Sequence, residues 1–148
     1  MYNKTSMKKI NKKQKYIPGD YKLKVKRSYA GLGLFALEEI PKDVCIIEYF
    51  GRIISPEEEY TSNSKYLFEI NSRKTIDGTD RKNIARYINH SCRPNCEPRI
   101  HKGKVYILSI KKIIPSEELC YDYGKEYFNE HIKPNGCRCP KCTLKKQD

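Results

Sequence analysis

The feature that most constrains this 148-residue chain is one string, RYINHSCRPNC, at positions 86–96. Within it, Asn89 and His90 follow a stretch at 84–88 that is apolar enough to be buried. Buried backbone, amide and imidazole groups need hydrogen-bond partners, because an unpaired polar group inside a protein costs free energy. We therefore expect other groups of the chain or of a ligand to satisfy Asn89 and His90.

Further motifs accompany this string in a definite order. They are GLGLF at 31–35, EYFG at 48–51, ELCYDYG at 118–124, and a cysteine cluster, CRCPKC, at 137–142. Together they resemble the signature of the SET-domain protein lysine methyltransferases, in which the Asn-His pair holds S-adenosylmethionine and a post-SET cysteine segment often follows. The resemblance covers residues 21–142, which is nearly the whole chain.

Short segments in which polar and apolar residues alternate predict a mainly β fold with few short helices. We expect strands in the segments 22–26, 44–49, 52–54, 66–70, 99–101 and 104–110. The sequence Ser55-Pro56-Glu57-Glu58 is a capping box that predicts a helix start, and Gly31-Leu32-Gly33 is expected to be a turn. Residues 81–88 predict another short helix. The SET resemblance implies small curved β-sheets with a knot-like C-terminal threading.

The length suits one domain, and the net charge of +12 favours an acidic partner. We expect a basic, disordered tail at 1–19, a SET domain at 20–124 and a post-SET zinc-binding segment at 125–148. The first fifteen residues hold no acid and six lysines, Lys4, Lys8, Lys9, Lys12, Lys13 and Lys15. This tail could be a nuclear address, a contact to nucleic acid or chromatin, or a solvated leader.

The resemblance implies a binding site for S-adenosylmethionine. A methyl donor of this size needs close backbone approach, which glycine permits because it lacks Cβ. The donor-binding residues implied by the resemblance are Gly31, Leu32, Gly33, Arg86, Asn89, His90 and Tyr123. Tyr127 and Phe128 could cover the adenine ring or belong to the core.

Methyl transfer to lysine requires an uncharged amine aligned behind the methyl group. Holding a lysine neutral near pH 7 means a pKa shift of about three units, or roughly 4 kcal/mol, which desolvation and the donor's sulfonium favour. The resemblance implies a substrate channel of Tyr49, Tyr66, Phe68, Tyr121 and Tyr123, with Tyr123, Tyr121 and Tyr49 as catalytic residues. The tyrosine at position 121 is expected to favour mono- or dimethylation.

Four of the seven cysteines are expected to bind Zn²⁺. Cys137, Cys139 and Cys142 supply three thiolates, and the resemblance implies Cys92 as the fourth ligand. Cys96 is the alternative fourth ligand. The spacing departs from the commoner Cys-x-Cys-x₄-Cys of the family. Cys45 and Cys120, in apolar strand contexts, are expected to be buried packing thiols.

The leading hypothesis is an S-adenosylmethionine-dependent protein lysine N-methyltransferase acting on a histone or another basic protein. The alternative is a non-catalytic basic module that binds nucleic acid or chromatin. No apolar run approaches the roughly 18 residues of a membrane span, so no membrane contact is expected. We expect an intracellular protein of the cytoplasm or nucleus, with a secreted effector acting in a host cell as the alternative; monomer and homodimer stay open.

Overall fold

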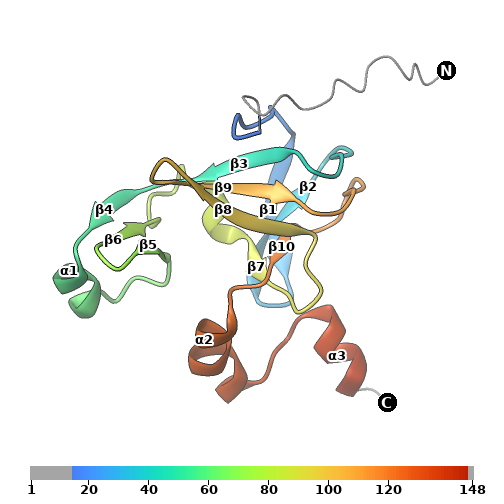
Figure 1. The fold of residues 1–148 in the computed structure, drawn as a ribbon. Helices are drawn as coiled ribbons and strands as arrows, with labels where there is room; N and C mark the ends of the chain where they lie inside the picture. The colour runs from blue at the N-terminus through green and yellow to red at the C-terminus, as the bar shows by residue number, and fades with distance from the viewer. Residues whose placement is uncertain (1–14, 147–148) are drawn as a thin grey trace.

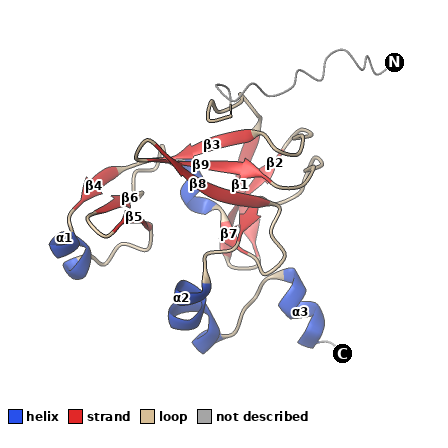
Figure 2. Cartoon of the chain, in the orientation of Figure 1, coloured by secondary structure: helices blue, strands red, loops and turns tan. Residues whose placement is uncertain are grey.

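The computed structural model describes residues 15–146, which fold into short strands and short helices (Figure 1, Figure 2). The strands are β1 (Leu23–Ser28), β2 (Gly31–Ala36), β3 (Cys45–Tyr49), β4 (Arg52–Ile54), β5 (Leu67–Asn71), β6 (Lys74–Asp77), β7 (Asn89–His90), β8 (Cys96–His101), β9 (Lys104–Ser109) and β10 (Cys120–Tyr121). The helical segments are α1 (Pro56–Thr61), η3 (Ile84–Tyr87), α2 (Lys125–Tyr127), η4 (Phe128–Ile132), η5 (Lys133–Asn135) and α3 (Pro140–Lys146). No helix in this part of the chain is long and apolar enough to cross a bilayer.

The strands form four small sheets, which confirms the predicted mainly β fold class. Two sheets have three strands each, in the orders β3-β9-β8 and β4-β6-β5. The others are the antiparallel pair β1-β2 and the parallel pair β10-β7. In Figure 1 the β4-β6-β5 sheet and α1 lie at one end, and α2 and α3 lie together below the central strands. The fully buried core between these sheets includes Leu34, Ile40, Ile88, Ile107, Ile113 and Leu119.

Local sequence signals account for α1 and for the β8-β9 hairpin. Ser55 caps α1, since its Oγ accepts a hydrogen bond of 3.3 Å from the backbone N of Glu58, as the capping box predicts. The hairpin turns at Lys102 and Gly103, which both have positive φ, 49° and 76°. Two consecutive left-handed residues match the twist of the flanking strands, so the predicted turn position is confirmed.

The prediction of a turn at Gly31-Leu32-Gly33 is wrong. These residues form the first half of β2, and the chain turns at 29–30 instead. Gly33 pairs with Lys26 in the β1-β2 ladder. Gly31 alone has the left-handed backbone, φ 101°, that favours glycine at the end of a tight turn. Strands β1 and β2 therefore form an antiparallel hairpin, and the glycine motif belongs to its second strand.

The C-terminal part of the domain lies against the segment that follows β7. Strand β10 runs parallel to β7, pairing Cys120 with Asn89 and Tyr121 with His90. The side chain of Asn95 binds the backbone next to β10. Its Nδ2 donates to the carbonyl of Glu118 and its Oδ1 accepts from the backbone N of Cys120, both at 2.9 Å. This is the segment for which the resemblance implies the knot-like threading. Residues 89–90 and 120–123 consequently share one site.

Most of the predicted basic tail, residues 1–14, lies outside the described residues. The residues that follow contact the domain. Tyr16 stacks on the ring of His101 with centroids 4.1 Å apart, and the backbone N of Gly19 donates to the carbonyl of Cys45 at 3.0 Å. Residues 16–19 are thus packed along the β8-β9 and β3 side of the fold.

Candidate active site and cysteine cluster

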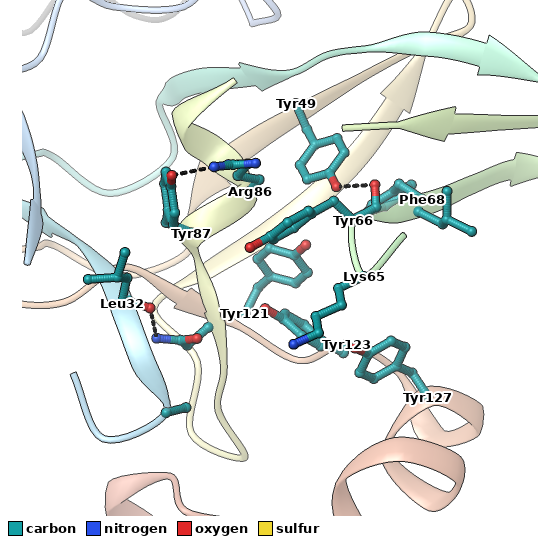
Figure 3. A pocket seen from close by; sticks show the side chains of 13 residues that line it. Leu32, Tyr49, Lys65, Tyr66, Phe68, Arg86, Tyr87, Tyr121, Tyr123 and Tyr127 are labelled. Atoms are coloured by element: carbon teal, nitrogen blue, oxygen red, sulfur yellow. Dashed lines mark hydrogen bonds between the residues drawn. The ribbon is translucent and has the colours of Figure 1, made fainter. Parts of the chain in front are cut away.

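A cavity of about 390 Å³ opens where β2, β5, β7 and β10 come together (Figure 3). Of the residues predicted to bind the donor, Leu32, Arg86, Asn89 and Tyr123 line it. Of the predicted channel residues, Tyr49, Tyr66, Phe68, Tyr121 and Tyr123 line it. The two predicted groups therefore border a single space, although they come from segments up to 91 residues apart, the separation of Leu32 and Tyr123.

At one end of the cavity, the side-chain amide of Asn89 is held by two acceptors. Its Nδ2 donates to the carbonyl of Leu32 and to Oε1 of Glu118, each at 2.9 Å. Because both amide hydrogens are used inside the protein, Oδ1 of Asn89 is the atom that can accept a hydrogen bond from a ligand. Glu118 also accepts from Oγ of Ser28 at 2.8 Å, through Oε2.

Glu118 also explains the glycine at position 33. A Cβ built on Gly33 would collide with the Glu118 carboxylate and would lie 2.9 Å from Cβ of Ser28. Gly33 is buried, and its missing side chain makes room for the carboxylate that holds Asn89. Sequence reasoning missed Glu118, although it is the first residue of the ELCYDYG motif.

The tyrosine hydroxyls at the other end donate to backbone carbonyls. Tyr49 Oη donates to the carbonyl of Tyr66 at 2.7 Å, and Tyr123 Oη donates to the carbonyl of Ile88. Burial raises the pKa of Tyr49 and that of Tyr123 well above 10, with nearby acidic groups adding to the effect. These hydroxyls therefore stay protonated at neutral and moderately alkaline pH.

The tyrosine rings pack against one another around the cavity. Tyr121 and Tyr123 have ring centroids 4.9 Å apart, and Tyr123 meets Tyr127 at 5.1 Å in an edge-on arrangement. Tyr121 is buried, and burial raises its pKa as well. Tyr127, which the sequence left open between adenine cover and core, lines the cavity and is about one-third exposed. The result is an aromatic wall with neutral polar tips.

Two cationic residues, Arg86 and Lys65, line the same cavity. Arg86 lies over the Tyr66 ring at 4.7 Å and donates to the Thr79 carbonyl at 2.6 Å and to the hydroxyl of Tyr87. Its buried Nε has no partner among the described residues. Lys65 makes no ion pair with a described residue and extends beside the cavity tyrosines in Figure 3. Within residues 15–146, no carboxylate side chain lines the cavity.

Sequence reasoning missed Lys65. It follows a loop of small polar residues and precedes a strand, and no motif marks it. Ala30, Leu67 and Tyr87 also line the cavity without having been predicted. Conversely, Gly31, Gly33 and His90 do not line it themselves: the glycines flank Leu32 on β2, and the His90 ring lies behind Tyr123.

The cysteine cluster lies close to this cavity. The Sγ atoms of Cys92, Cys137, Cys139 and Cys142 all lie within 4.8 Å of one another, so the group could hold a metal ion. Cys96 is instead buried in β8, 1% exposed, and does not belong to the cluster. Cys45 is buried, as predicted, whereas Cys120 is only half-buried.

The thiols of Cys92 and Cys139 differ in pKa. Burial alone would raise the pKa of Cys139, but hydrogen bonds from the backbone of Cys92 and Cys142, together with its neighbouring thiols, lower it to about 6. Burial and hydrogen bonding to the same thiols raise the pKa of Cys92. Of these two thiols Cys139 has the lower pKa, and the thiolate is the form in which cysteine binds metal.

Comparison with known proteins places residues 31–124 in the SET domain family. The chain is similar to the histone-lysine N-methyltransferase trr of Drosophila melanogaster, with 38% identity over 76% of this chain and 5% of that protein. It is also similar to the H3 lysine-4 specific histone-lysine N-methyltransferase of Saccharomyces cerevisiae, with 36% identity over 93% of this chain and 14% of that protein. The chain therefore spans only a small part of these relatives' length.

A solved structure shows the same architecture. It is a humanized mutant of the Chaetomium thermophilum Polycomb Repressive Complex 2 bound to the inhibitor GSK126, with a TM-score of 0.65 and 32% identity over 72% of this chain and 15% of that chain. The family match covers well over half of this chain and includes its GLGLF, EYFG, Asn-His and ELCYDYG motifs. This chain belongs to the SET-domain family.

Proposed function

We propose that this chain is an S-adenosylmethionine-dependent protein lysine N-methyltransferase. The SET methyltransferase family uses S-adenosylmethionine as its donor. The observation that carries the proposal is the single cavity in which a fixed amide, Asn89, faces a tyrosine wall. Such a cavity can take a polar donor at one end and an aliphatic amine along the other.

The residues that line the cavity fit the charge pattern of S-adenosylmethionine. Asn89 Oδ1 can accept from the donor's ammonium, and the backbone of 31–33 lies beside it. Lys65 and the guanidinium of Arg86 line the same cavity and can balance the charge of its carboxylate, because no described acidic side chain lines the cavity to compete. The tyrosine rings suit its positive sulfonium, since ring faces attract cations. When bound, the donor supplies the methyl group for an in-line transfer.

Tyr123 is the residue that we assign to aligning the amine. Because its hydroxyl hydrogen is given to the Ile88 carbonyl, the lone pairs of Oη can accept from the substrate amine and from the polarised methyl C–H groups. Tyr49, Tyr66, Phe68 and Tyr121 line the channel that desolvates the lysine stem. His90 supports Tyr123 from behind, with the two rings 5.5 Å apart.

The lysine substrate loses its proton without a protein base in this mechanism. None of the described residues that line the cavity is an aspartate, glutamate or histidine. The aromatic channel disfavours the charged ammonium by desolvation, and the donor's positive charge acts in the same direction. The proton therefore leaves to water as the lysine enters, and the tyrosine hydroxyls, which burial keeps neutral, do not take it.

The cysteine cluster is proposed to hold one structural Zn²⁺ through Cys92, Cys137, Cys139 and Cys142. Four thiols close to one another match the closed, four-ligand composition of structural zinc sites. Zinc would tie the segment after α2 to the loop after β7. The shorter Cys-x-x-Cys spacing is compatible with this grouping, since Cys142 is within reach of Cys92 at 3.7 Å.

The proposed substrate is a histone or a similar basic protein. The relatives are named as histone-lysine N-methyltransferases, and the one from Saccharomyces cerevisiae as specific for lysine 4 of H3. A histone substrate would place the enzyme at chromatin in the nucleus. Tyr121, whose ring borders the channel and whose hydroxyl can hold a water, is expected to limit transfer to one or two methyl groups.

The test is transfer of labelled methyl from S-adenosylmethionine to recombinant histones and to lysine-to-arginine histone variants, with the product located by mass spectrometry. Asn89→Ala should abolish transfer and S-adenosylhomocysteine binding together. Arg99→Gln is a matched control, because Arg99 pairs with exposed Glu97 away from the cavity. The proposal fails if zinc-loaded chain binds no S-adenosylhomocysteine in calorimetry.

A further inference from the structure

His90 lies between the cysteine cluster and Tyr123, with one ring nitrogen next to each. Its Nδ1 is 3.1 Å from the backbone N of Tyr123, and its Nε2 is 3.4 Å from Sγ of Cys92. The residue is only 7% exposed, so water does not compete freely for either nitrogen. The two contacts join parts of the site that are more than thirty residues apart in the sequence.

These contacts determine which nitrogen carries the ring hydrogen. The amide of Tyr123 is a donor, so Nδ1 must offer it a lone pair. A neutral imidazole has one N–H, which therefore lies on Nε2 and faces the sulfur of Cys92. The nearby carboxylate of Asp122 does not change this, because its Oδ1 is 3.8 Å from Nδ1 and accepts from the backbone N of Gly124 instead.

Packing holds the ring in this orientation. The Tyr123 ring meets the His90 ring edge-on at 5.5 Å, and Phe128 covers it at 5.3 Å. The backbone of His90 is fixed too, since its carbonyl accepts from Tyr29 Oη at 2.8 Å and β7 pairs with β10. A flip of the His90 ring would turn both nitrogens away from their partners. The packing therefore keeps both hydrogen-bond contacts in place.

We propose that His90 is a positioning residue that couples the cysteine cluster to Tyr123, donating from Nε2 to Sγ of Cys92, which would be a thiolate with Zn²⁺ bound, and accepting at Nδ1 from the Tyr123 amide. The inference rests on the proposed function for the roles of the cluster and of Tyr123. A hydrogen bond to a metal-binding thiolate orients that ligand. The bond to the Tyr123 amide fixes the backbone from which its hydroxyl reaches the amine.

Two substitutions separate the two bonds. In His90→Asn, Oδ1 can take the place of Nδ1 and keep the Tyr123 bond, but the side chain is too short to reach Cys92. In His90→Gln, the amide nitrogen can take the place of Nε2 and keep the Cys92 bond. We expect His90→Asn to weaken Zn²⁺ binding about tenfold to a hundredfold and His90→Gln to change it little. We expect His90→Gln, not His90→Asn, to speed exchange of the Tyr123 amide hydrogen.

Zn²⁺ affinity is measured by competition with a chromophoric chelator, and amide exchange by NMR on the zinc-loaded full chain. In wild type, removing the metal should also speed exchange at Tyr123; in His90→Asn, where the link to Cys92 is cut, it should not. Equal loss of both properties in both variants would show a merely structural role and overturn the proposal.

A measurement on wild type keeps the proposal testable if a variant fails to fold. Long-range ¹⁵N–¹H correlation spectra of the zinc-loaded chain should show a protonated Nε2 and a bare Nδ1 at His90, and the opposite tautomer would overturn it. None of these readouts uses methyl transfer. If the tautomer and the difference between the two His90 variants are as expected but no methyl transfer is found, only the proposed function is contradicted. If methyl transfer is normal but the two variants do not differ, only the coupling through His90 is contradicted.

Discussion

The amide of Asn89 donates to the carboxylate of Glu118 at 2.9 Å, across 29 residues of sequence. The same carboxylate accepts from Ser28 and occupies the space that a side chain at Gly33 would need. Three of the motifs that define the chain thus meet at one carboxylate. Its position fixes which atom of Asn89 faces a ligand, and this makes the donor end of the cavity sensitive to Glu118.

We expect Glu118→Leu to weaken S-adenosylhomocysteine binding about tenfold, because Asn89 loses a hydrogen bond to a charged acceptor, an interaction of about 1.5–3 kcal/mol. Glu118→Gln should keep most of the affinity, since its amide oxygen can still accept from Asn89 while Ser28 rotates its hydroxyl. Isothermal titration calorimetry measures both. Equal losses in the two variants would contradict this role of Glu118.

Tyr123→Phe should keep the fold and donor binding but lower the rate of methyl transfer by about two orders of magnitude, the usual effect of removing one positioned polar group at the reacting atoms. The change removes one hydroxyl without opening a cavity. Single-turnover kinetics with saturating peptide measures it. Tyr127→Phe is the matched control, because the Tyr127 ring meets Tyr123 at 5.1 Å but has no hydroxyl hydrogen bond among the described residues. Wild-type turnover in Tyr123→Phe would remove the catalytic assignment.

Tyr121→Phe should shift the product from mono- and dimethyllysine towards di- and trimethyllysine, with little change in the rate of the first transfer. The Tyr121 hydroxyl can anchor a water in the volume that a methylated amine needs in order to rotate. Intact-mass spectra of a peptide substrate over time report the distribution. If wild type reaches trimethyllysine as readily as this variant, the proposed role of Tyr121 is wrong.

About one zinc ion per chain is expected, and Cys139→Ser should lower both zinc content and activity, because Cys139 is one of the four clustered thiols and its neighbours lower its pKa to about 6. Elemental analysis of protein purified without chelator measures the content. Cys45→Ala serves as control, since Cys45 is a buried cysteine outside the cluster. Protein that carries no zinc before any substitution would count decisively against the metal assignment.

The rate should rise with pH. Burial raises the pKa of Tyr49, Tyr121 and Tyr123 above 10, which keeps these hydroxyls neutral, while a free lysine loses its proton with a pKa of about 10.4. From about pH 7 to about pH 9.5, kcat/KM should therefore increase up to tenfold per unit without a falling limb. Circular dichroism and zinc content at each pH serve as controls. A decline below about pH 9.5 in folded, zinc-loaded protein would show that a group of the site titrates there.

The sequence by itself determined the local elements and the identity of most cavity residues. The capping box at Ser55 and the Lys102-Gly103 turn were readable, because each depends on backbone preferences within a few residues. The channel tyrosines came from the resemblance of the motifs to the SET-domain family. It also showed that three cysteines at 137–142 belong together. The fourth thiol, however, stayed open between Cys92, which the resemblance implies, and its rival Cys96.

Only the tertiary structure decided the rest. The packing of β8 buries Cys96 while the loop after β7 brings Cys92 to the cluster. It also turned the Gly31-Leu32-Gly33 segment into a strand, and it placed Glu118 at Gly33 and Lys65 at the cavity. These relationships join residues far apart in sequence, and their geometry is set by the pairing of β7 with β10 and by core packing. A local sequence pattern reports only on neighbouring residues. It therefore cannot show which distant side chains the packing of the strands brings into contact.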